Sequence, residues 1–178
     1  SFDRPVAIAI SRNSAPMTDA DAVLSTGIAD LDLILGGGIT RPALAVVIGT
    51  PGAGKTILAS QILFNAARQG WKTIVFTAFS EGITQYTQHM QSLALFDPTA
   101  LGDTVQLFTL TSQMTDAEAN PASVIAQAIR NTGAKVVVLD GFQGIESMGV
   151  NAQRVRVLLA ASRIASARAN ASSMGHFR

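Results

Sequence analysis

The sequence predicts an α/β protein, in which a mainly parallel sheet carries helices on both faces. Short apolar runs alternate with helix-like segments through most of the 178 residues, which is the pattern of βαβ units. Apolar residues make up 48% of the chain and charged residues 14%, a balance that supports a core and excludes a disordered chain. A glycine-rich loop also joins the first long apolar run to the first long helix.

The first 25 residues are expected to form an arm outside the core. Ser11–Asp21 is rich in Ser, Asn, Pro, Thr and Asp, a composition typical of loops. Val6–Ile10 could add a strand to a sheet, including the sheet of a neighbouring subunit, but we favour a loosely packed leader. The predicted organisation is therefore an N-terminal arm, residues 1–25, and one domain, residues 26–178.

The domain opens with a short helix over Thr26–Asp32, which glycines Gly36–Gly38 end. Strands are expected where continuous apolar runs could be covered on both faces. These runs are Ala43–Ile48, Thr73–Phe79, Val105–Leu110 and Lys135–Asp140. Helices are expected over Lys55–Gln69, Gln85–Leu95, Pro121–Asn131 and Ala152–Asn170.

The loop after the first of these strands matches the pattern G-x-x-x-x-G-K-[ST] in full, as Gly49-Thr50-Pro51-Gly52-Ala53-Gly54-Lys55-Thr56. Glycines let such a loop curl so that backbone N–H groups point at phosphate oxygens, and the following helix adds positive potential. Lys55 is expected to reach the β- and γ-phosphates of ATP or a close relative, and Thr56 to place its hydroxyl on Mg²⁺. A glycine turn with a chance Lys-Thr is the alternative, but the strand before and the helix after argue against it. The expected nucleotide contacts are Thr50, Pro51, Gly52, Ala53, Gly54, Lys55 and Thr56.

Two carboxylates are candidates for the same site. Asp140 ends an apolar strand, where an acid often supplies Mg²⁺ directly or through water. A buried strand that merely reaches solvent is the alternative, and the phosphate loop upstream favours the Mg²⁺ role. Glu81 lies just past the second strand, where it could orient or deprotonate an attacking water. From spacing alone, that role and an ordinary loop glutamate are equally supported.

Composition narrows the classes of function. The net charge of +1 and the lack of a basic stripe argue against a dedicated nucleic-acid binder. With no cysteine and only His89 and His176, zinc-thiolate and histidine-rich metal sites are also disfavoured. No apolar run approaches the roughly 18 residues of a membrane span, so a cytoplasmic protein is expected. The late arginines predict an exposed or subunit-facing stripe; they are Arg154, Arg156, Arg163 and Arg168.

Together these segments resemble the KaiC-type branch of the RecA-like ATPases. The approach to the loop, Thr26-Gly27-Ile28 with Asp32 and Gly36-Gly37-Gly38-Ile39, is similar to the lead-in of that branch. Gln61–Asn65 resembles the helix after its P-loop, and Val136–Asp140 resembles its Walker B strand. Phe79-Ser80-Glu81 falls where the branch usually has Phe-Glu-Glu. The resemblance runs from about Thr26 to Ala169.

The resemblance implies a three-layer α/β/α P-loop NTPase fold of RecA type and assigns roles to matching residues. Lys55 and Thr56 take the phosphate and Mg²⁺ roles, Asp140 takes the Walker B role, and Glu81 becomes the water-activating carboxylate. Lys55 and Glu81 are therefore the candidate catalytic residues. Sites in such families lie between subunits, so the resemblance also implies a homo-oligomer, for which a ring is one form. Ser80 stands in place of the first paired glutamate, which predicts slow hydrolysis or a use of nucleotide in switching and assembly.

The C-terminal end departs from the family. RecA-like chains continue past the helix after Walker B into a strand that lies between the P-loop strand and the Walker B strand. Residues 170–178 contain no apolar run that could supply it. The alternatives are a fragment whose core is truncated at the C-terminus, an altered tail, or a sheet that closes differently, and we favour the fragment.

The leading functional prediction is Mg²⁺-dependent ATP binding and hydrolysis to ADP. The alternative is a catalytically weak nucleotide-binding module with a regulatory or assembly role, which Ser80 and the C-terminal departure favour. A DNA-dependent recombinase-like ATPase is a further alternative, which the near-neutral charge and the lack of a basic or aromatic binding loop oppose. A small-molecule P-loop kinase is weaker still, since no arginine-rich lid follows Asp140.

Overall fold

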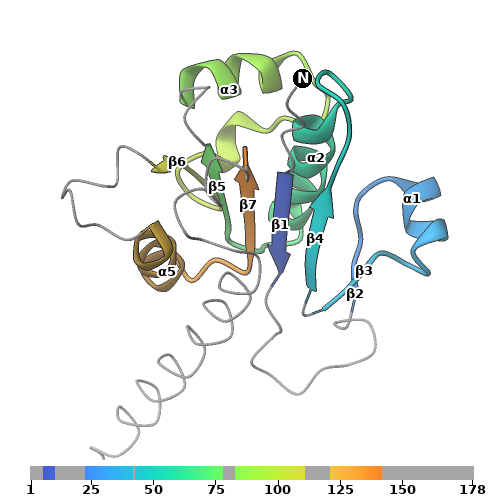
Figure 1. Ribbon diagram of the computed structural model, residues 1–178, viewed down its shortest axis with the longest axis horizontal. Coiled ribbons are helices and arrows are strands. Elements are labelled where there is room, and N and C mark those ends of the chain that lie inside the picture. The colour runs from blue at the N-terminus through green and yellow to red at the C-terminus, as the bar shows by residue number, and fades with distance from the viewer. Residues whose placement is uncertain (1–5, 11–22, 42, 78–82, 111–120, 142–178) are drawn as a thin grey trace, which may run out of the picture.

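The computed structural model describes residues 6–10, 23–41, 43–77, 83–110 and 121–141. Their centre is a five-stranded sheet with the order β4-β1-β7-β5-β6 (Figure 1). The strands are β1 (Val6–Ile10), β4 (Ala43–Val47), β5 (Thr73–Thr77), β6 (Val105–Thr109) and β7 (Val136–Asp140). β5 pairs in parallel with β6 and β7, whereas β1 pairs antiparallel with β4 and β7. All strands of this sheet except β1 therefore run in one direction, which confirms the mainly parallel α/β fold.

Helices cover both faces of this sheet and make three layers. On one face lie α2 (Lys55–Arg68) and α3 (Ile83–Gln91), and on the other lies α5 (Pro121–Thr132) (Figure 1). A smaller unit stands to the side, where α1 (Ala29–Ile34) connects the paired strands β2 (Val23–Leu24) and β3 (Ile39–Thr40). A single 3₁₀ turn, η2 (Pro98–Ala100), precedes β6. This layering is the one predicted for a P-loop NTPase.

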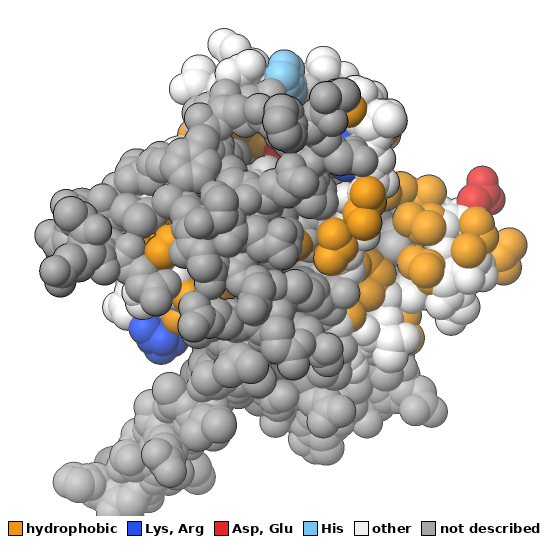
Figure 2. Space-filling model, viewed as in Figure 1, with side chains coloured by type: hydrophobic (Ala, Val, Ile, Leu, Met, Phe, Trp, Pro, Cys, Tyr) orange, Lys and Arg blue, Asp and Glu red, His pale blue; other side chains and the backbone are white. Residues whose placement is uncertain are grey.

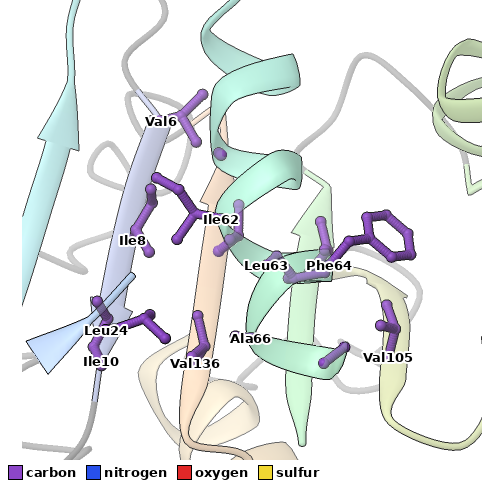
Figure 3. Close-up of a cluster of buried hydrophobic side chains, with 14 of the residues drawn as sticks. Val6, Ile8, Ile10, Leu24, Ile62, Leu63, Phe64, Ala66, Val105 and Val136 are labelled. Atoms are coloured by element: carbon purple, nitrogen blue, oxygen red, sulfur yellow. The ribbon is translucent and has the colours of Figure 1, made fainter. Parts of the chain in front are cut away.

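The core under α2 forms because two periodicities meet. Residues two apart on β1 point to one face of the sheet, and residues three or four apart on α2 point to one side of the helix. Val6 and Ile8 of β1 accordingly pack in one cluster with Ile62 and Ala66 of α2, and all four are at most 2% exposed (Figure 3). Burial of each larger side chain contributes about 1.5–3 kcal/mol. This cluster fixes α2, and with it the glycine loop, on the sheet.

The opposite core lies between α5 and the other face of the sheet. Ile125 and Ile129 of α5 pack with Ile74, Phe76 and Leu139 of the strands, and all are at most 2% exposed. Strands covered on both faces carry apolar residues at nearly every position. The continuous apolar runs of the sequence therefore predicted β5 and β7 correctly.

The expectation that residues 1–25 form a loosely packed arm is wrong for Val6–Ile10. Each residue of β1 is at most 1% exposed, and the strand lies between β4 and β7. Five successive apolar side chains have no stable place in a leader, because burial on both faces of a sheet is their most favourable state. The sheet thus closes differently from the RecA-like pattern: β1, running antiparallel, occupies the position between the P-loop strand and the Walker B strand.

Several element boundaries differ from the predicted ones. The first helix begins at Ala29 rather than Thr26, and α3 spans Ile83–Gln91 rather than Gln85–Leu95. The pair β2–β3 and the turn η2 were not predicted, because two- and three-residue elements leave no periodic signal. The predicted helix Ala152–Asn170 and its arginines lie outside the described residues.

Apolar side chains remain exposed beside the sheet edge. Leu33 and Ile34 of α1 are 82% and 80% exposed, and Val46 and Ile48 at the end of β4 are 43% and 73% exposed. Figure 2 shows hydrophobic side chains gathered over this part of the molecule. β4 is also an edge strand, so one side of its backbone has no partner strand among the described residues. We call Leu33, Ile34, Val46 and Ile48 the α1–β4 surface.

Candidate functional site

The glycine loop leads from β4 into the N-terminus of α2. Gly52 and Gly54 both adopt a φ of 80°, a left-handed conformation that glycine reaches without strain. Gly54 is the residue before the helix, and its carbonyl accepts the amide of Leu58 at 2.9 Å. Inside the loop, the amide of Ala53 donates to the carbonyl of Thr50 at 3.1 Å. The loop is therefore bent tightly, and the N-terminus of a 14-residue helix faces the space beyond it.

Lys55 folds back over the loop that precedes it. Its ammonium group donates to the carbonyl of Gly49 and to the carbonyl of Thr50, the latter at 2.8 Å. Lysine ammonium groups carry three donors, so this position holds the charge among loop oxygens without using up its hydrogen-bonding capacity. A phosphate on the loop would lie close to this charge.

Thr56 and Asp140 meet although 84 residues separate them in the sequence. The hydroxyl of Thr56 donates to Oδ2 of Asp140 at 3.0 Å, and both residues are half-buried. The contact forms because α2 crosses the face of the sheet on which Asp140 ends β7. Hydroxyl and carboxylate oxygens, completed by phosphate and water, are the donors that Mg²⁺ prefers. The pair fits a magnesium ion held beside the loop.

The other predicted site residues lie partly inside and partly outside the described part of the chain. The structure places Thr50, Gly52, Ala53 and Gly54 in the loop, and Pro51 lies among them as an exposed residue. Glu81 and Ser80 lie outside the described residues, and the nearest described residue downstream is Ile83, the first of α3. The assignment of the catalytic carboxylate therefore stays a prediction.

Thr77 is a polar residue at the carboxyl end of β5 that was not predicted as part of the site. It ends β5 and is paired in register with Asp140, so the two residues share one face of the sheet. Thr77 is 2% exposed, and its hydroxyl has no hydrogen-bond partner among the described residues. The available signal was a polar residue inside the otherwise largely apolar predicted strand Thr73–Phe79.

A buried polar contact joins α2 to α3 behind the loop. The Tyr86 hydroxyl lies 2.6 Å from Oγ of Ser60, and Ser60 donates to the carbonyl of Thr56 at 2.7 Å. Burial raises the pKa of Tyr86 to about 12; the Ser60 hydrogen bond opposes that rise, and the negative charge of Asp140 adds to it. The Tyr86 hydroxyl therefore stays protonated at neutral pH.

The lead-in before the loop is held by Asp32. Its carboxylate accepts hydrogen bonds from the Ser25 hydroxyl at 2.6 Å and from the amide and hydroxyl of Thr26 at 2.7 and 2.6 Å. Partial desolvation raises the pKa of Asp32, but these bonds outweigh it and lower the pKa below the usual 3.8. Asn65 of α2 then donates to the Ser25 carbonyl at 3.0 Å, which ties the lead-in to the helix after the loop.

Among the helices of the described residues, none combines the length and the apolar character needed to cross a lipid bilayer.

The mainly parallel sheet, the glycine loop at the start of α2 and the paired Thr56 and Asp140 define the class of protein as a RecA-like P-loop ATPase. The family model described as "ATPase: KaiC" matches residues 24–171. The chain belongs to this KaiC family of ATPases, as the lead-in and loop motifs had indicated.

Relatives share parts of this sequence. A UPF0273 protein of Pyrobaculum aerophilum is 32% identical over 126 residues, which are 62% of this chain and 44% of the relative. The circadian clock oscillator protein KaiC of Acaryochloris marina is 34% identical over 73 residues, 41% of this chain and 14% of that protein. The DNA repair protein RadA of Brucella abortus is 29% identical over 141 residues, 77% of this chain and 27% of RadA. The chain thus spans less than half the length of each of these relatives.

Proposed function

We propose that this chain binds Mg-ATP at the loop Gly49–Thr56 and hydrolyses it to ADP and phosphate. The observation that carries the proposal is the 3.0 Å hydrogen bond from Thr56 to Asp140, because it brings a hydroxyl and a carboxylate together at the phosphate loop. Membership of an ATPase family supports nucleotide binding and ATPase activity in general. The proposal adds to this family-level activity that the chain itself hydrolyses ATP and that hydrolysis depends on Mg²⁺.

In this proposal each part of the loop has its own task. Backbone N–H groups of the loop, except at Pro51, and the N-terminus of α2 bind phosphate oxygens. Lys55 moves its ammonium from the loop carbonyls to the β- and γ-phosphates. Thr56 and Asp140 would hold Mg²⁺, which when bound neutralises charge on the phosphates. Glu81 takes a proton from the attacking water as the water oxygen bonds to the γ-phosphorus, and the bond from that phosphorus to the bridging oxygen breaks to release ADP.

The test is phosphate release from Mg-ATP by the 178-residue chain, with Lys55→Ala as the blank. Turnover above the blank supports hydrolysis, and turnover equal to the blank contradicts it. Glu81→Gln should then retain ATP binding and lose about 10²- to 10⁴-fold in turnover, which is the usual contribution of a positioned base. Unchanged turnover in Glu81→Gln would remove Glu81 from the mechanism.

The second candidate function is nucleotide binding without appreciable turnover, as in a regulatory or assembly module. The specific observation in its favour is Ser80, which stands where the family usually has a glutamate. Ligand bound only by the folded state raises stability by mass action, by about 2.7 kcal/mol at a hundredfold excess over Kd. A melting temperature that rises with Mg-ATP while no phosphate is released would select this function.

Self-association is also part of the proposal. The α1–β4 surface supports it, since large apolar side chains gather there beside an edge strand. Light scattering should then show an oligomer that Ile34→Lys weakens. Thr99→Lys should leave it intact, since Thr99 is exposed in the turn before β6, the edge strand opposite β4. A monomer at all concentrations would contradict self-association and leave the proposed ATP hydrolysis untouched.

A further inference from the structure

The contact between Ser60 and Tyr86 takes no part in binding phosphate, Mg²⁺ or water in the proposed function. Both residues are 1% exposed, and they come from different helices, α2 and α3. An apolar pair would fill this position without a requirement for hydrogen bonding, since buried polar groups are costly unless they are paired. The polar pair lies one helical turn beyond Thr56, on the helix that carries the phosphate loop.

The hydrogen atoms in this contact can be assigned. Ser60 has one hydroxyl hydrogen, and at 2.7 Å it donates to the carbonyl of Thr56. The 2.6 Å contact with Tyr86 therefore uses the Tyr86 hydrogen, which Ser60 accepts. Tyr86 of α3 thus donates to Ser60, and Ser60 donates to the backbone carbonyl of Thr56. The side chain of Thr56 in turn donates to Asp140.

We propose that Ser60 and Tyr86 are positioning residues that couple the first turn of α2 to α3. The inference rests on the proposed function, in which Thr56 changes partner from Asp140 to the metal and Glu81 acts on water. Ser60 donates to the backbone of Thr56 and accepts from Tyr86, so the pair fixes the first turn of α2 against α3. Neither residue binds phosphate or Mg²⁺ in that proposal, and both act on turnover by positioning Thr56.

The kinetic test uses variants that keep the packing. Tyr86→Phe retains the ring and removes the hydroxyl, and Ser60→Ala removes its acceptor. We expect each to lower kcat by about three- to tenfold with KM for Mg-ATP unchanged, because both variants lose the hydrogen bond between the two side chains. Ser60→Ala also loses the bond to the Thr56 carbonyl. The double variant should lose no more than the larger single loss, since both changes remove one link.

The matched control is Ser92→Ala, which removes a hydroxyl just beyond the C-terminal end of α3. Ser92 is exposed and donates to the His89 carbonyl at 3.0 Å, at the opposite end of the helix from Ile83. Its kcat should equal that of the wild type. Unchanged kcat in Tyr86→Phe, or losses that multiply in the double variant, would overturn the coupling and leave the contact as a structural one.

Hydrogen exchange separates failure of the coupling from failure of the proposed function. Calorimetry first measures binding of Mg-ADP, and exchange of α3 amides is then compared with and without it. We expect α3 to exchange more slowly on binding in the wild type and to lose that response in Tyr86→Phe. Binding without any change in α3 overturns the coupling alone, and no binding overturns the coupling and the proposed function together. A response of α3 without turnover supports the coupling and contradicts hydrolysis only.

Discussion

At the scale of single residues, the site depends on groups that are placed by hydrogen bonds rather than by charge alone. Thr56 and Asp140 hold each other at 3.0 Å, and Lys55 rests on the loop carbonyls. A side chain already held in place loses less conformational freedom when a ligand arrives, so binding costs less. The residue types could be predicted from the motif, whereas their mutual distance could not.

Asp140→Asn tests the magnesium role. Asparagine keeps an acceptor for Thr56 but loses the negative charge, so the fold should persist while Mg²⁺-dependent nucleotide affinity falls about 10- to 100-fold. Titration of Mg²⁺ at fixed ATP measures the effect. Asp103→Asn, an exposed carboxylate before β6, is the control and should behave as the wild type. Equal Mg²⁺ dependence in both variants would remove Asp140 from the metal site.

Asp32 predicts a pH dependence of stability. Its pKa is lower in the folded protein than the usual 3.8, so its contribution is fully present above that value. That contribution is lost as the pH falls through the folded-state pKa. Asp32→Asn should lower stability at neutral pH by about 1 kcal/mol and flatten the decline below about pH 4.

Urea midpoints measured between pH 2 and pH 7 would check this. Asp30→Asn, at an exposed position on α1, serves as the control and should keep the acid dependence of the wild type. A decline of the same steepness in Asp32→Asn would show that other carboxylates carry it.

At the scale of elements, the lead-in works as a small unit docked on α2. β2 and β3 pair around α1, and Asn65 and Gln61 of α2 donate to the carbonyls of Ser25 and Gly27, at 3.0 and 3.4 Å. The chain continues from β3 into β4 and the loop. The family lead-in is therefore a structural device that connects both sides of the phosphate loop.

Gly38→Ala should damage this unit. A Cβ at Gly38 would lie 2.3 Å from the carbonyl oxygen of Leu24, a backbone atom that cannot turn aside, and φ is +135°. Gly36, with φ of +71° and no atom within 4 Å of its added Cβ, is the matched control. Thermal unfolding should show a loss above about 2 kcal/mol for Gly38→Ala and about 1 kcal/mol for Gly36→Ala. Equal losses would mean that only the backbone conformation matters.

At the scale of the whole molecule, β1 decides whether the sheet is continuous. It pairs with the P-loop strand through Val6–Val47 and with the Walker B strand through Ala7–Leu139. Without β1, the facing edges of β4 and β7 would lose their hydrogen-bond partners, and each buried unpaired group costs about 1–3 kcal/mol. The spacing between Thr56 and Asp140 therefore depends on residues at the far end of the sequence.

Ile8→Ala tests this role of β1. Ile8 is fully buried between β4 and β7, so truncation should cost about 2–5 kcal/mol and lower nucleotide affinity through the sheet. Ile83→Ala is the same chemical change at a 39% exposed position outside the α1–β4 surface and should cost less than about 1 kcal/mol. Denaturant midpoints of the two variants give the comparison. Similar midpoints would show that β1 is dispensable for the fold.

Local patterns in the sequence determined much of this protein. The glycine loop, the α2 helix and the apolar strands β4, β5 and β7 were predictable, because turn chemistry and side-chain periodicity act between neighbouring residues. Asp140 was predicted as a metal ligand because it ends an apolar strand downstream of the phosphate loop, and that role stays a prediction. Each of these features is formed by a short segment, so the residues of that segment are enough to predict it.

Only the tertiary structure decided how the segments meet. The place of β1 between β4 and β7, the Thr56–Asp140 contact across 84 residues and the Ser60–Tyr86 contact across 26 all join distant parts of the chain. Val6–Ile10 has the same apolar character whichever strand it pairs with, so its pattern could not select a partner. The choice depends on which arrangement buries most apolar surface and satisfies most backbone groups at once, and that sum exists only for the folded chain.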